Sequence, residues 1–152
     1  MSRGRIFLRY WLPVILWMCL IYTASDDRAS LQHSSRIIEL ILRWLFPHLA
    51  NATVHEVVYL VRKCAHLTEY AVLALFIWRA LRKPVRNDLR PWNWREAFIV
   101  LGWVALYAAS DEIHQLFVSS RQGSVLDVLI DTSGASLGLL AVWAIGRWRK
   151  LW

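Results

Sequence analysis

The chain has few cysteines, which could cross-link it, and few glycines and prolines, which interrupt helices. It also has few acidic residues. Its 152 residues include two cysteines, six glycines and four prolines. Cys19 and Cys64 have no C-x-x-C partner, which argues against a disulfide framework or a zinc motif. Eleven acidic residues stand against 18 basic ones, a formal net charge of +7. There is no internal repeat or low-complexity run, and we expect one domain over residues 1–152.

Apolar residues are abundant. They make up 57% of the chain, which has ten tryptophans and a mean hydropathy of +0.36. About 20 apolar residues suffice to cross a bilayer, whereas so short a soluble domain could not bury several long apolar runs. We therefore predict an all-α membrane protein, a bundle of four transmembrane helices. The expected spans are approximately 6–24, 54–82, 96–117 and 125–148.

Most basic residues flank these apolar segments and form no patch suited to nucleic acid. Most precede the first segment, lie at the junction of the second and third, or follow the fourth, whereas the opposite loops hold only Arg28, Arg36, Arg43 and Arg121. Because Lys and Arg mark cytoplasmic loops, we expect both termini to be cytoplasmic. Membrane lipids are the expected partners, with no nucleic acid, and a homo-oligomer stays open.

A short amphipathic helix is expected in the first extracytoplasmic loop, at approximately 34–49. Arg36, Glu39 and Arg43 follow one stripe, apolar residues fill the remainder, and Pro47 ends the pattern. The segment is too short to span and suits the membrane interface. It either packs as a lid over the bundle, or senses lipid or gates a substrate.

Ionisable residues occur inside three of the apolar segments, where a charge is costly unless it is paired or functional. Counting from the basic ends places His66 about 20 Å, Asp111 about 22 Å and Asp131 about 24 Å into a hydrocarbon layer of about 30 Å. The three counts agree on the outer third of the membrane. The sequence therefore predicts one polar site shared by three helices.

Helical spacing predicts which polar residues face that site. The residues expected to share inward faces are Lys63, His66 and Tyr70, then Asp111, His114 and Gln115, then Asp127 and Asp131. Glu112 is expected to point about one residue to the side. Gly134 and Gly138 continue the stripe of the last segment and form a small-x-x-x-small surface for close helix packing.

The stretch that begins Asp111-Glu112-Ile113-His114-Gln115 is the most distinctive in the chain. Together with the upstream and downstream residues, it resembles the VanZ-like family of small bacterial membrane proteins, over about residues 61–140. The positions that match the family motif are Lys63, His66, Tyr70, Asp111, Glu112, Gln115, Arg121, Asp127, Gly134 and Gly138. The resemblance implies a multi-pass protein of the bacterial cytoplasmic (inner) membrane, linked in the family's namesake to low-level teicoplanin resistance.

We predict that the polar site opens to the extracytoplasmic face and binds a lipid-linked or lipid-anchored ligand of the cell envelope. A lipoglycopeptide antibiotic is one such ligand. The candidate ligand-binding residues are Lys63, His66, Tyr70, Asp111, Glu112, Gln115, Arg121, Asp127 and Asp131. Basic side chains suit a phosphate or carboxylate, and acidic ones accept hydrogen bonds from hydroxyls or amines.

Other classes stay open. An intramembrane hydrolase or transferase acting on a lipid-linked envelope precursor would use His66 as general base, with Asp111 or Glu112 orienting it. Arg121 would then stabilise developing negative charge. A small dimeric transporter is less favoured, because the polar residues are one-sided. No cofactor follows from the sequence, and the spacing of His66, Asp111, His114 and Asp127 matches no compact two-histidine metal signature, so no metal is predicted.

Overall fold

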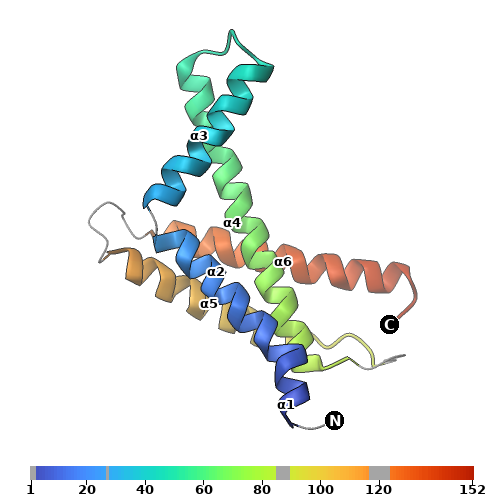
Figure 1. Ribbon diagram of the computed structural model, residues 1–152. Coiled ribbons are helices and arrows are strands. Elements are labelled where there is room, and N and C mark those ends of the chain that lie inside the picture. Colours follow the sequence, from blue (N-terminus) through green and yellow to red (C-terminus); the bar gives the residue numbers. More distant parts are fainter. Residues whose placement is uncertain (1–2, 27, 85–89, 117–123) are drawn as a thin grey trace.

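All regular secondary structure in the described part of the chain is helical, which confirms the all-α prediction. A computed structural model of the protein describes residues 3–26, 28–84, 90–116 and 124–152. In chain order the elements are α1 (Arg3–Ile6), the π-helical turn η1 (Phe7–Trp11), α2 (Leu12–Asp26), α3 (Arg28–Leu45), α4 (Asn51–Arg82), α5 (Trp94–Leu116) and α6 (Val125–Trp148) (Figure 1).

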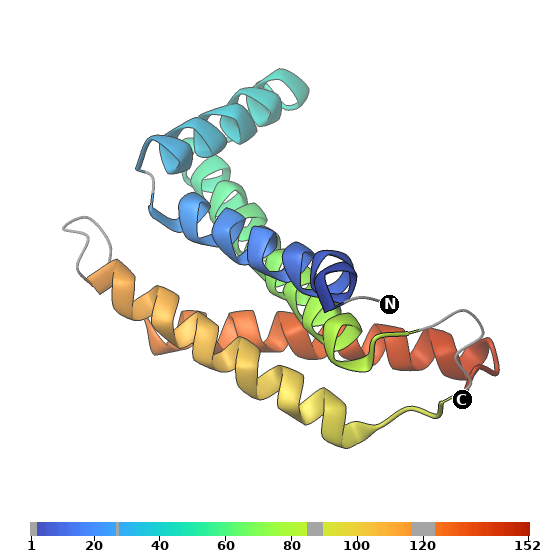
Figure 2. The same cartoon turned by 60° about the horizontal axis from the view of Figure 1, so that its bottom comes forward.

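Helices α2, α4, α5 and α6 form a bundle in which α4 is central. α4 packs along α6 and α5, and α2 packs on α4 and α5. Figure 2 shows α2 and α4 side by side above α5 and α6. Fully buried residues of small or medium size fill its middle, namely Leu73, Ala74, Val104, Ala108 and Ala135. Such residues allow close packing, which holds helices together where the solvent is lipid.

Three helices are long and apolar enough to cross a membrane, at residues 4–24, 51–82 and 125–148. They coincide with three of the four predicted spans. α5 overlaps the remaining one, 96–117, but polar residues in its last turns lower its hydropathy, and residue 117 lies outside the described residues. Four spans and the cytoplasmic placement of both termini therefore stay predictions.

Pro13 accounts for the irregular start of the first helix. A proline has no N–H to donate, so the carbonyl of Arg9 loses its helical partner. The helix widens here into η1, where the N–H of Leu12 donates to the carbonyl of Phe7. The carbonyl of Arg9 instead accepts a hydrogen bond of 3.0 Å from the Arg79 guanidinium. This contact fastens the N-terminal helix to the end of α4.

Gly134 and Gly138 let α6 touch α4 backbone to backbone. A Cβ atom at Gly134 would lie 2.8 Å from the Cα of Leu67, and one at Gly138 would lie 3.1 Å from the Cα of Ala71. Any side chain at these positions would therefore push the helices apart. The predicted small-x-x-x-small surface is the α4–α6 contact, and it fixes which face of α6 carries Asp131.

The end of the bundle where α1 and α5 begin and α4 and α6 end is rich in Lys and Arg, and we call it the basic end. Tryptophans also gather there, with neighbouring ring centroids 5.7 or 5.8 Å apart. They are Trp78, Trp92, Trp94, Trp143 and Trp152. Indole rings favour the membrane–water interface, so this end has the character of an interfacial belt.

α3 and the first part of α4 form a hairpin that projects from the bundle (Figure 1). The bounds predicted for the amphipathic helix, 34–49, are wrong, since α3 runs over Arg28–Leu45 and ends before Pro47. α3 begins at Arg28, so the polar residues before 34 belong to it although their helical pattern is weak. Arg43 donates to Glu39 at 2.9 Å and to Asn51 at 2.8 Å, which closes the hairpin.

α4 is longer than the hydrocarbon core of a bilayer is thick. Its 32 residues measure about 48 Å, against about 30 Å of hydrocarbon. About 20 helical residues span the hydrocarbon core. Counted back from Arg82, they reach Arg62, which is next to Lys63. On this count the hairpin lies outside the hydrocarbon, where an interfacial position for α3 stays a prediction. Its apolar side chains Ile37, Ile41 and Trp44 are exposed.

Candidate functional site

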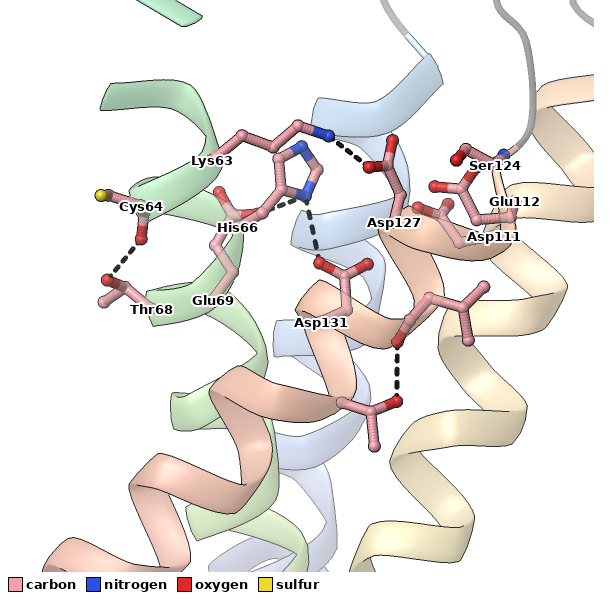
Figure 3. Close-up of polar contacts among 12 residues, drawn as sticks. Lys63, Cys64, His66, Thr68, Glu69, Asp111, Glu112, Ser124, Asp127 and Asp131 are labelled. Carbon is pink, nitrogen blue, oxygen red and sulfur yellow. Dashed lines mark hydrogen bonds and ion pairs between the residues drawn. The ribbon is translucent and has the colours of Figure 1, made fainter. Parts of the chain in front are cut away.

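Three helices bring charged side chains together at the end of the bundle away from the basic end. We call this group the polar cluster. Its charged members are Lys63, His66 and Glu69 on α4, Asp111 and Glu112 on α5, and Asp127 and Asp131 on α6 (Figure 3). α5 ends and α6 begins here, so a short connection suffices to bring their acids to the same depth as the middle of α4.

Lys63 and Asp127 form an ion pair at the rim of the polar cluster. Lys63 Nζ donates a hydrogen bond to Oδ1 of Asp127, and the two side chains are 23% and 30% exposed. The ammonium also lies 5.5 Å from the centre of the Tyr59 ring. A partly exposed pair is cheaper to open than a fully buried one, so both groups are accessible to a ligand.

His66 lies between two carboxylates. Its Nδ1 atom is 3.8 Å from Oε2 of Glu69 and 3.8 Å from Oδ1 of Asp131. Both distances exceed hydrogen-bond length, so these contacts act through charge when the imidazole is protonated. The side chain of His66 is 29% exposed and that of Asp131 only 4%. His66 therefore connects the open rim with a buried acid.

α5 turns Asp111, Glu112 and Gln115 into the bundle, where all three are buried. Gln115 Nε2 donates to Oδ2 of Asp111 at 3.2 Å. Oε2 of Glu112 accepts a 2.8 Å hydrogen bond from the backbone N–H of Ser124, the N-cap of α6. The hydroxyl oxygen of Ser124 in turn accepts from the N–H of Leu126. Glu112 thus fixes the start of α6 against α5.

His114 is half-buried, and its side chain contacts α2. His114 Nε2 shares a hydrogen bond of 2.8 Å with the Tyr22 hydroxyl on α2, and the two rings lie 4.7 Å apart. The buried stripe of α5 runs through Ala108, Asp111 and Glu112. Glu112, which was expected to point about one residue to the side, is therefore a buried member of the polar cluster, whereas His114 bonds to α2.

Tyr70 is fully buried beneath the polar cluster, and no described residue hydrogen-bonds its hydroxyl. The hydroxyl is close enough to interact electrostatically with Asp131 and Asp111. The ring lies 6.2 Å from that of Tyr107, whose own hydroxyl donates to the Met18 carbonyl at 2.7 Å. Leaving a buried hydroxyl unsatisfied costs about 1–3 kcal/mol, so a new hydrogen bond to the Tyr70 hydroxyl would be favourable.

Two polar residues of this region were not among the predicted ligand-binding residues, and one candidate has no described position. Arg121 lies outside the described residues. Glu69 was expected among the ionisable residues of the second apolar segment but was not assigned to the site, although it is three residues after His66. Tyr22 gave no such signal, because its partner His114 lies on another helix and 92 residues away.

Acceptors dominate the chemistry of the polar cluster, since its carboxylates outnumber its cations. Within residues 3–26, 28–84, 90–116 and 124–152, no three His, Cys, Asp or Glu side chains are arranged to hold a metal ion. Cys19 and Cys64 are exposed and not joined to each other. The arrangement is suited to accept hydrogen bonds from hydroxyls or amines, and to hold a proton between His66 and an acid.

The sequence matches the family model VanZ/LLP1 over residues 10–146. This range includes every charged member of the polar cluster and both glycines of the α4–α6 contact. No curated protein matches the chain, nor does any solved structure. Because the match covers most of the chain, the resemblance carried by the motif is confirmed, and the protein belongs to the VanZ/LLP1 family.

Proposed function

We propose that this protein is an integral membrane protein of the bacterial cell envelope that binds a lipid-linked or lipid-anchored ligand at the polar cluster. The observation that carries the proposal is the convergence of buried and half-buried charges from α4, α5 and α6 at one end of a helical bundle. Charges at membrane depth are rare unless they are paired or functional. Here Lys63 pairs with Asp127, and His66 lies between Glu69 and Asp131.

The cluster favours a headgroup that donates hydrogen bonds. An ionised carboxylate only accepts, and Asp111 and Asp131 present such acceptors inside the bundle. Sugar hydroxyls and amines are matching donors, and the Tyr70 hydroxyl, which has no partner among the described residues, is a further group that such a ligand could bond. Lys63 at the rim suits a phosphate or carboxylate of the same ligand. Arg121, which lies outside the described residues, stays the second predicted contact for that group.

The Lys and Arg bias favours a cytoplasmic position for the basic end, so the polar cluster faces the extracytoplasmic leaflet of the inner membrane. All four predicted spans are part of this proposal, with α5 as the third. Lipoglycopeptides of the teicoplanin type combine a sugar- and amine-bearing head with an acyl chain. A contribution to resistance against them follows from binding at this site.

Native mass spectrometry of the purified protein tests the proposal. We expect a co-purified lipid-linked species on the wild type and a loss of about tenfold in occupancy on Lys63→Ala and Asp111→Asn, about 1.4 kcal/mol each. Lys83→Ala and Glu39→Gln are matched controls, since both residues lie outside the polar cluster. Equal occupancy in all five proteins, or no bound species in any, contradicts the proposal.

An intramembrane hydrolase or transferase acting on a lipid-linked precursor is the second candidate. The observation in its favour is the position of His66 between Glu69 and Asp131, where a base could exchange a proton with an acid. His66→Ala would then abolish turnover of a labelled precursor while leaving its binding intact. Loss of binding without any wild-type turnover favours the binding protein. A small dimeric transporter would instead show uptake into proteoliposomes that depends on a pH gradient.

A further inference from the structure

An apolar groove lies between α2, α4 and α5, on the half of the bundle toward the basic end. It encloses about 500 Å³. Trp11 and Met18 line it from the N-terminal helix, Ile77 and Leu81 from α4, and Trp103 from α5. All of its lining residues are apolar or aromatic. The groove is separate from the polar cluster, which lies between α4, α5 and α6.

A hydrogen bond closes the groove at the end nearer the polar cluster. There the hydroxyl of Tyr107 donates to the Met18 carbonyl at 2.7 Å. The one hydroxyl in the lining is therefore satisfied, and water inside would find few partners, although a stable water needs two to four. A hydrocarbon occupant fits this lining better than water does.

The groove opens sideways to the surroundings of the bundle. Trp103 and Leu106 on α5 are 61% and 69% exposed, and Ile15 on α2 is 43% exposed. These residues lie on helices within the apolar part of the chain, and α2 and α4 both belong to candidate membrane spans. The medium at the opening is therefore lipid, and the groove is continuous with the acyl chains around the protein.

Two exposed arginines precede the groove on the side of the basic end, Arg5 on α1 and Arg95 on α5. They come about two helical turns before Trp11 and Trp103, the first lining residues of the two helices. Arg95 shares a helix stripe with Trp103, at i and i+8. Glu96, the residue after Arg95, forms an ion pair of 3.6 Å with Arg82, so it opposes an anion only weakly. Two further arginines are occupied elsewhere, since Arg9 and Arg79 lie over the Tyr10 ring.

The distance from these arginines to the closed end suits one lipid chain. Arg95 to Tyr107 is about 18 Å along the α5 axis, and Arg5 to Met18 is about 20 Å along the N-terminal helix. One leaflet contributes about 15 Å of hydrocarbon, half of a core of about 30 Å, and the phosphate lies a few ångströms beyond it. The two counts along different helices agree with a chain that ends at the hydrogen bond between Tyr107 and Met18.

We propose that this groove binds one acyl chain of an anionic phospholipid from the leaflet at the basic end, with Arg5 and Arg95 contacting the phosphate. Hydrophobic burial holds the chain, and the arginines select the negative headgroup. This site is independent of ligand binding at the polar cluster. The bound acyl chain would fill the space between α2 and α5.

The test is native mass spectrometry of full-length protein released from nanodiscs that contain equal phosphatidylglycerol and phosphatidylethanolamine. We expect the wild type to retain phosphatidylglycerol preferentially. Ile15→Trp places an indole in the groove, and we expect about tenfold less retained lipid. Leu16→Trp is the matched control, since Leu16 is exposed on the neighbouring position and is not part of the lining. We expect it to retain lipid as the wild type does.

The headgroup is tested separately. Arg95→Gln should reduce the preference for phosphatidylglycerol by about fivefold while total retained lipid changes little. Arg149→Gln removes an exposed charge from the C-terminal residues and should leave the preference unchanged. Equal lipid retention by the two tryptophan variants overturns the proposal, as does equal retention of both lipids by the wild type. A dimer that Ile15→Trp disrupts would show that a second copy of the chain occupies the groove, and would also overturn it.

Discussion

Gly134→Ala tests whether backbone contact between α4 and α6 sets the geometry of the polar cluster. The new Cβ would lie 2.8 Å from the Cα of Leu67, against backbone that cannot rotate away. Overpacking of this kind costs about 1–3 kcal/mol. Alanine is also a better helix former than glycine by about 1 kcal/mol, which offsets part of that cost. We expect a net destabilisation of about 0–2 kcal/mol.

Gly102→Ala separates the two contributions. Gly102 is in the middle of α5, and a Cβ there meets no atom within 4 Å, so only the helix-propensity gain of about 1 kcal/mol applies. The two variants should therefore differ in unfolding free energy by about 1–3 kcal/mol. Thermal unfolding in one detergent, followed by tryptophan fluorescence, measures the difference. Equal stability of Gly134→Ala and Gly102→Ala would refute the close-contact argument, since both then gain the same propensity.

Two further predictions concern single groups of the polar cluster. Lys63→Met and Asp127→Asn should each lower the unfolding free energy, and the double variant should lose less than the sum of the two losses. A double-mutant cycle should give a coupling energy of about 0.5–3 kcal/mol. Strictly additive losses would show that the ion pair contributes nothing. Tyr70→Phe should raise the unfolding free energy of the ligand-free protein by about 1–3 kcal/mol, because it removes a buried hydroxyl that has no partner among the described residues. It should nevertheless lower ligand occupancy in native mass spectra. A large loss of stability with unchanged occupancy would contradict a ligand-directed hydroxyl.

The sequence predicted the helical class and three of the spans because long apolar runs are a one-dimensional signal. The bounds 125–148 coincide with α6, and those of the second span differ from α4 by only three residues at the start. Depth could also be counted, because an α-helix has a fixed rise. Lys63, Asp111 and Asp127 share one end of the bundle for that reason (Figure 3).

Orientation around a helix axis was harder to predict. Glu112 and His114 are two residues apart, which places them about 200° apart around the helix. Asp111 faces the bundle whichever of the two is assigned to the polar cluster. What decides between them is the position of α2, because Tyr22 on that helix bonds His114. The sequence carries no signal for that pairing. Likewise, the sequence carries no signal for the hydrogen bond from Arg79 to the Arg9 carbonyl, because the two residues are 70 positions apart.

The length of α4 couples the polar cluster to the thickness of the surrounding bilayer. A tilt of 40°, at the upper end of the usual range, still leaves about 37 Å of this helix along the membrane normal, more than the hydrocarbon of about 30 Å. Hydrophobic mismatch therefore decides how far the Lys63 turn emerges. We expect shorter acyl chains to place that turn among the headgroups and longer ones to submerge it, so that bilayer thickness changes how exposed the acids below are.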